Sequence, residues 1–118
     1  MQTTLKNAVI RRVGRDSLQD VVNHGADSGY PGFTYYTDTC AFYAKHQSSI
    51  VELVESMADD LGESPTKLVA GFRCLNGDYT EAEIGRTLYG PKRQHDTQIA
   101  NALAWFALEE IARSVADN

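Results

Sequence analysis

The sequence predicts an all-α fold, a compact helical bundle formed by a single domain over residues 1–118. Three observations support this prediction. Apolar residues recur at helical spacing in several segments, as they do in helices that bury one face. Capping residues and Gly or Pro stops separate these segments from one another. The only candidate for the alternating pattern of a strand is the short stretch 33–36.

The composition is that of a globular protein and excludes several other classes. Of the 118 residues, 42% are apolar and 23% are charged, which excludes a disordered or collagen-like chain. No apolar run approaches the roughly 20 residues that cross a bilayer, and residues 1–6 do not resemble a signal peptide. We therefore expect a cytoplasmic protein. Cys40 and Cys74 lie far apart without a CxxC motif, so neither a disulfide framework nor a zinc site is indicated.

The N-terminal region contains one kinked helix or two. Leu5, Val9 and Val13 fall at helical spacing, and Leu18 continues the pattern after Gly14. The next stretch, residues 24–38, is rich in glycine and aromatic residues, and its aromatic area predicts an ordered loop. Its tyrosines either anchor the loop to the core or form a protein interface, where tyrosine is enriched. The candidates for contact with a partner are Tyr30, Tyr35 and Tyr36.

Residues 47–62 form the clearest amphipathic helix in the sequence, with Gly62 in position to end it. Ile50, Val54 and Leu61 mark its apolar side. Acidic residues gather on the opposite side, where they either keep the surface soluble or contact a basic partner. These acidic residues are Glu52, Glu55, Asp59 and Glu63, with Asp60 at the edge.

Three further helices are predicted after residue 62. Pro65 opens a short one, and the capping box from Thr80 to Glu83 begins the next, which stops at Gly90. The last helix covers about residues 97–116. Its segment 102–108 is apolar all round, which predicts a central helix with Trp105 in the middle of the bundle.

The reactive side chains do not form a recognisable catalytic or metal-binding motif. His24, His46, His95 and Cys40 lack the close spacing of HExxH or CxxC, and no glycine-rich phosphate loop occurs. Cys40 stands beside apolar residues and is expected to be a small core side chain. We therefore expect a protein that is not an enzyme and that needs neither a cofactor nor a metal.

Charge separates two binding hypotheses. The net charge is −5, with an excess of bases in residues 1–15 and a strong excess of acids in residues 16–63, which disfavours non-specific nucleic-acid binding. Residues 80–93 nevertheless resemble the first helix and turn of a helix-turn-helix, and Lys92 and Arg93 follow that turn. The helix that comes next carries core residues instead of groove-reading ones, so DNA binding is kept as the alternative. The main hypothesis is a protein-binding module that uses Glu52, Glu55, Asp59, Asp60, Glu63, Tyr30, Tyr35 and Tyr36.

Several segments resemble a family of small uncharacterised proteins of bacteria, phages and plasmids. The most specific segment is residues 24–39, which read HGxxSGxxGFTYYxDT, and residues 57–61, 79–85 and 101–110 also resemble that family. No activity is assigned to the family, so the resemblance implies no catalytic residue. It implies an accessory protein of mobile elements. By analogy of genomic setting, it suggests an inhibitor of a host defence complex, such as an anti-CRISPR protein that binds an effector subunit.

Overall fold

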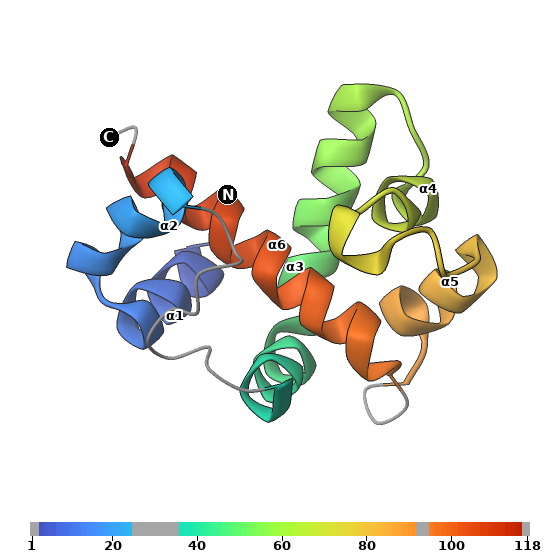
Figure 1. The fold of residues 1–118 in the computed structure, drawn as a ribbon, viewed down its shortest axis with the longest axis horizontal. Coiled ribbons are helices and arrows are strands. Elements are labelled where there is room, and N and C mark those ends of the chain that lie inside the picture. The colour runs from blue at the N-terminus through green and yellow to red at the C-terminus, as the bar shows by residue number, and fades with distance from the viewer. Residues whose placement is uncertain (1–2, 25–35, 92–94, 117–118) are drawn as a thin grey trace.

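The computed structural model describes residues 3–24, 36–91 and 95–116, and every regular element in these ranges is helical (Figure 1). The all-α class predicted from the sequence is thus confirmed. The elements, in chain order, are α1 (Thr3–Val13), η1 (Arg15–Ser17), α2 (Leu18–His24), α3 (Tyr36–Leu61), α4 (Pro65–Ala70), η3 (Arg73–Leu75), α5 (Glu81–Tyr89) and α6 (Thr97–Ala116), where η denotes a 3-10 helix.

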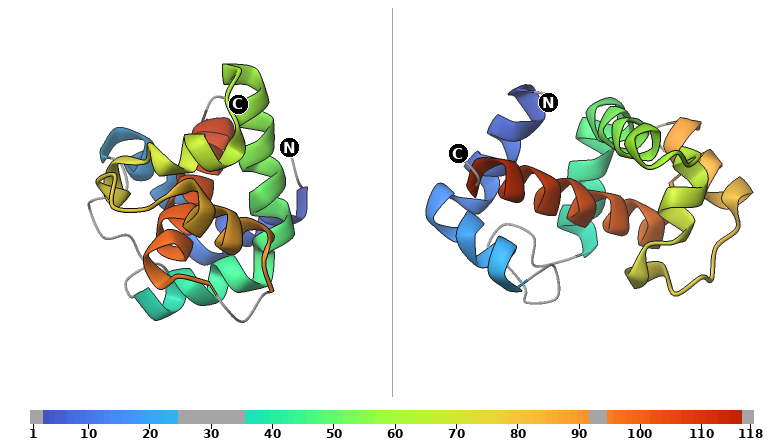
Figure 2. Two further views of the ribbon diagram at one scale, coloured as in Figure 1. Left: turned by 90° about the vertical axis from the view of Figure 1, so that its right-hand side faces the viewer. Right: turned by 90° about the horizontal axis from the view of Figure 1, so that it is seen from above.

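Helix α6 is the central element, as the sequence predicted. It runs through the middle of the molecule, with α1 and α2 around its C-terminal half and α3 and α5 around its N-terminal half (Figures 1 and 2). Two adjoining rows of α6 are fully buried, because residues three and four apart share one helix face. They consist of Ile99, Ala100, Leu103, Ala104, Ala107, Leu108 and Ile111.

Trp105 does not lie in the middle of the bundle, contrary to the sequence prediction. Trp105 and Phe106 are only partly buried and pack against the rim of the core, where Phe106 stacks on Phe72 with ring centroids 5.1 Å apart. The two buried rows of α6 are filled by alanine, leucine and isoleucine, whose side chains are all smaller than that of tryptophan. These let the neighbouring helices approach closely and leave no room there for an indole ring.

The N-terminal region forms two α-helices and not one kinked helix. Gly14 has φ 88°, a conformation that L-residues other than glycine rarely adopt, and it ends α1 before the turn η1. Most of the apolar residues at this spacing are buried, namely Leu5, Val9, Val13, Leu18 and Val21, whereas Val22 is 40% exposed.

Helix α3 begins at Tyr36 and joins a first helical stretch, which carries Cys40, Phe42 and Tyr43, to the predicted segment 47–62. His46 has non-helical angles (φ −115°, ψ 20°), so α3 consists of two helical halves joined by a kink. The predicted stop at Gly62 is confirmed. Gly62 has φ 70°, and the amides of Gly62 and Glu63 donate to the carbonyls of Asp59 (3.2 Å) and Ala58 (2.9 Å), which is a Schellman motif.

Side-chain caps fix the beginnings of the later helices. Ser64 accepts a hydrogen bond from the amide of Lys67 ahead of Pro65, and Thr80 and Glu83 form the predicted capping box. Asp96 caps α6, because its Oδ1 accepts hydrogen bonds from the amides of residues 98 and 99 at 2.9 and 3.1 Å.

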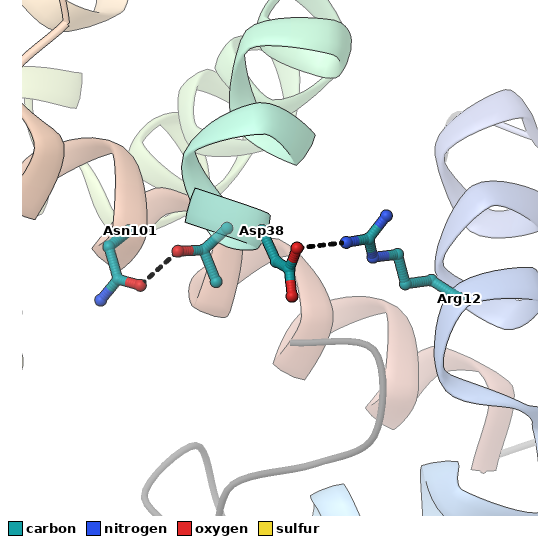
Figure 3. A network of polar contacts seen from close by, with 4 residues as sticks. Arg12, Asp38 and Asn101 are labelled. Atoms are coloured by element: carbon teal, nitrogen blue, oxygen red, sulfur yellow. Dashed lines mark hydrogen bonds and ion pairs between the residues drawn. The ribbon is translucent and has the colours of Figure 1, made fainter. Parts of the chain in front are cut away.

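Polar contacts near the start of α3 tie three helices together (Figure 3). Arg12 of α1 lies 3.3 Å from the carboxylate of Asp38. The next residue, Thr39, is buried and donates a hydrogen bond of 2.5 Å to Asn101 of α6. The N-terminal half of α3 is therefore fixed against α1 and α6, while its C-terminal half extends past α4 (Figure 1).

Candidate protein-interaction site

All five acidic residues predicted as a contact surface are exposed along the C-terminal half of α3 and its end. We call residues 52–63 the acidic segment. No basic residue occurs between Lys45 and Lys67, and within the described ranges none of the five carboxylates belongs to an ion pair. The charged residues of the acidic segment are Glu52, Glu55, Asp59, Asp60 and Glu63.

The end of the acidic segment is electrostatically unfavourable for the helix that carries it. Asp59 and Asp60 lie in the last turn of α3, which contains no basic residue. A helix C-terminus has partial negative charge, so each carboxylate there costs roughly 0.3–1 kcal/mol at low ionic strength. A second cost comes from Glu55 and Asp59, which are like charges one helical turn apart. Helix stability alone does not account for this arrangement.

A groove of about 420 Å³ lies between the acidic segment and the end of α5. Glu52 and Glu55 stand on the α3 side, and Tyr89 stands on the α5 side. Val51 and Leu88, both buried, supply apolar surface between them. The remaining lining residues are Gln47, Ser48 and Gly90.

A joint between α3 and α5 adjoins the groove through Gln47, Leu88 and Gly90. The amide nitrogen of Gln47 lies within hydrogen-bond distance of three carbonyl oxygens, those of Thr87 (3.2 Å), Leu88 (3.1 Å) and Gly90 (3.3 Å). The hydroxyl of Tyr43 donates to the carbonyl of Thr87 at 2.9 Å. These carbonyls are at the C-terminal end of α5, where a helix lacks internal donors. Two side chains of α3 therefore cap α5.

This capping fixes the orientation of the Gln47 amide and leaves its oxygen without a partner. Three carbonyls face the nitrogen, so the nitrogen must be the atom on that side. The side-chain oxygen of Gln47 is buried, and it accepts no hydrogen bond from the described part of the chain. Gln47 as a whole is 6% exposed, yet it lines the groove. A buried acceptor of this kind is uncommon in native structures.

Tyr89 covers one side of the groove with an exposed ring. The ring is 55% exposed, which makes Tyr89 one of the few large apolar side chains exposed in the described ranges. Its hydroxyl donates to Oε2 of Glu55 at 3.3 Å, and partial burial together with the Glu55 carboxylate raises the pKa of Tyr89. The contact holds Glu55 at the rim of the groove.

The structure brings together only part of the predicted contact set. Four of the acidic residues lie on α3 and Glu63 follows its end, but Tyr30 and Tyr35 lie outside the described residues, and so does the side chain of Tyr36. Sequence reasoning missed Gln47 and Tyr89. Their proximity depends on the crossing of α3 and α5, and no sequence signal specified it.

The reactive side chains do not assemble into a catalytic group within the described residues. Cys40 is partly buried and its Sγ donates to the carbonyl of Thr97 at 3.5 Å, while burial raises the pKa of the thiol. His46 packs on Phe42 with ring centroids 4.7 Å apart. In the parts that the structure describes, no group of three His, Cys, Asp or Glu side chains could hold a metal ion. The side chain of His24 lies outside those parts.

The helix-turn-helix hypothesis gains no support from the arrangement of α5 and α6. Helix α6 would be the reading helix, but it is the central helix of the fold. Lys92 and Arg93, the bases that motivated the hypothesis, lie outside the described residues. Among the described helices, none is long and apolar enough to cross a membrane.

The fold and this groove define a small all-α protein with an exposed acidic segment on α3 and its end. The chain matches the model of a domain of unknown function, DUF7222, over residues 2–118, and it belongs to that family. No curated protein and no solved structure matches the chain.

Proposed function

We propose that this protein is a non-enzymatic binding module whose acidic segment contacts a basic surface of a partner protein. The observation that carries this proposal is the set of five exposed carboxylates on residues 52–63, which have no ion-pair partner in the described ranges. Two of them occupy a helix end that they destabilise. Residues that lower local stability without compensation are typical of functional surfaces.

The finer form of the proposal is an inhibitor of a host defence complex in the cytoplasm of a bacterium. Carboxylates spaced along an exposed helix can occupy a basic channel that otherwise binds nucleic-acid phosphates. The resemblance to proteins of phages and plasmids supplies the setting in which such an inhibitor is useful. The most concrete version is an anti-CRISPR protein that binds an effector subunit.

The binding surface can be tested with a lysine dodecapeptide as the basic probe. Asp59→Lys reverses a charge of the acidic segment, and Asp78→Lys gives the same net charge from an exposed position outside it. We expect Asp59→Lys to weaken binding about tenfold at low salt, because charge complementarity governs steering and association. Asp78→Lys should weaken it much less. Equal losses in both variants would show that only net charge matters, and would refute the acidic segment as a specific surface.

The finer proposal needs a cellular assay. A phage is plated on bacteria that carry a CRISPR system directed against it, with and without expression of this protein. We expect expression to restore plaque formation and Asp59→Lys to abolish the restoration. If CRISPR systems of every tested type still block plaque formation although the wild-type protein is expressed, the anti-CRISPR version is refuted. The result with the lysine dodecapeptide is independent of that outcome.

A further inference from the structure

We propose that the groove between α3 and α5 binds the guanidinium group of an arginine side chain of the partner protein. Because this proposal rests on the proposed function, it specifies which basic group is recognised and where. Two observations lead to it, and they are independent of each other. One is the pair of carboxylates that line the groove, and the other is the buried, unpartnered oxygen of Gln47, which lines it as well.

The groove offers hydrogen-bond acceptors that differ in burial. Glu52 and Glu55 line its α3 side and are exposed, so they can meet a cation at the entrance. Gln47 lines the same groove, and its side-chain oxygen is buried and has no donor within the described ranges. A guanidinium carries five N–H donors in a fixed plane, so one group can contact a carboxylate and a buried oxygen simultaneously. A donor from the ligand would also satisfy the orphaned acceptor.

The apolar surfaces of the groove suit the rest of an arginine side chain. Val51 and Leu88 can contact the methylene groups, which carry no charge. The ring of Tyr89 stands beside Glu55, and a guanidinium can stack on an aromatic face while it pairs with a carboxylate. A volume of about 420 Å³ is enough for one such side chain.

These features favour arginine over lysine. An ammonium group is a compact, strongly hydrated charge, and it neither stacks on a ring nor forms two parallel hydrogen bonds. The acidic segment outside the groove attracts either residue equally. The groove is therefore the part of the surface that distinguishes the two basic side chains.

The test uses the full chain labelled with nitrogen-15 and the probe N-acetyl-arginine-N-methylamide. The side-chain amide of Gln47 gives its own pair of NMR signals, which report directly on the lining of the groove. We expect these signals and the backbone amides of Val51, Leu88 and Tyr89 to shift progressively, with saturation at millimolar probe. The corresponding citrulline amide has the same shape without the charge and should cause no comparable shift.

Variants locate the binding and separate it from general attraction. Glu55→Gln and Tyr89→Ala should each lower the affinity for the arginine probe about fivefold, since they remove a charged acceptor and a stacking surface, respectively. Glu63→Gln is the matched control, because Glu63 belongs to the acidic segment but does not line the groove. It should leave the arginine probe unaffected.

The outcomes distinguish this proposal from the broader one. The corresponding lysine amide serves as a second control probe. If the Gln47 signals do not move, or if the citrulline or lysine amide binds as tightly as the arginine amide, the guanidinium site is refuted. The lysine dodecapeptide tests the acidic segment separately, so its binding can survive that result. Shifts at the groove with arginine alone, which need about fivefold more probe in Glu55→Gln and are unchanged in Glu63→Gln, would establish the site.

Discussion

Reversing the charge of Asp59 should make this protein more stable while it weakens binding to a basic partner. Asp59 is exposed in the last turn of α3, and its own backbone carbonyl takes part in the Schellman motif at Gly62. The substitution Asp59→Lys places a positive charge beside the partial negative charge of the helix end. It also converts the like-charge pair with Glu55 into an attractive pair in the favourable order.

The expected gain can be assembled from these two effects. The helix-end effect is roughly 0.3–1 kcal/mol for the removed acid and a similar amount for the added base. Removing the repulsion between Glu55 and Asp59 adds roughly 0.2–0.5 kcal/mol, and the attraction between Glu55 and the new lysine adds a similar amount. Exposure to solvent reduces the sum, so we expect about 1 kcal/mol of added stability. For a chain of this size, that corresponds to a rise in melting temperature of roughly 3–6 °C.

The assay is thermal unfolding followed by circular dichroism at low and high salt. Asp78→Lys is the control, because it changes the net charge equally at a position outside any helix. We expect the stabilisation of Asp59→Lys to exceed that of Asp78→Lys at low salt and to shrink as salt screens the charges. If Asp59→Lys melts at or below the wild-type temperature at low salt, the helix-end reasoning is wrong. The acidic segment would then have no stability cost to explain.

Three further substitutions test the joint between α3 and α5. Gln47→Leu should lower the free energy of unfolding by about 1–3 kcal/mol, measured by urea titration, because it leaves buried carbonyls of α5 without a donor. Gly90→Ala should destabilise by a similar 1–3 kcal/mol, since the added Cβ would stand 2.2 Å from the carbonyl oxygen of Arg86. Burial lowers the pKa of His95 from its ordinary 6.5, and His95 packs edge-on against Tyr43. The contribution of His95 is therefore complete above about pH 6.5 and decreases as the pH falls, because the unfolded chain takes up the proton first. His95→Gln should reduce the slope of stability against pH below about pH 6.5, and an unchanged slope would contradict this reasoning.

Elements with local boundaries were predictable from the sequence. The capping box at Thr80, the opening at Pro65 and the stop at Gly62 use residues within one turn of the boundary, so their signals are complete in the sequence. The burial of Ile50 and Val54 followed from periodicity in the same way, whereas Leu61, predicted on the same side, is 59% exposed. The central position of α6 was predictable too, because a helix that is apolar all round needs neighbours on most sides.

Features that depend on how helices cross were not predictable. The joint at Gln47 links residues 40 or more positions apart in the chain, and no sequence pattern near Gln47 predicts it. The continuation of α3 through the kink at His46 depends on the contacts of its first half with α1 and α6. Trp105 was misplaced because hydrophobicity alone does not indicate which row of a helix meets its neighbours. The rows that meet the neighbouring helices carry alanine, leucine and isoleucine.

The central position of α6 has a consequence for the order in which this chain can fold during synthesis. Helices α1, α2 and α3 bury their apolar faces against α6, which follows all of them in the sequence. A ribosome adds roughly 5–20 residues per second, so several seconds separate the emergence of α1 from that of α6. Throughout that interval the apolar faces of the earlier helices have no final partner. The nascent chain should therefore depend on chaperones more than its size suggests, and any chain shortened before residue 97 should aggregate instead of forming a smaller bundle.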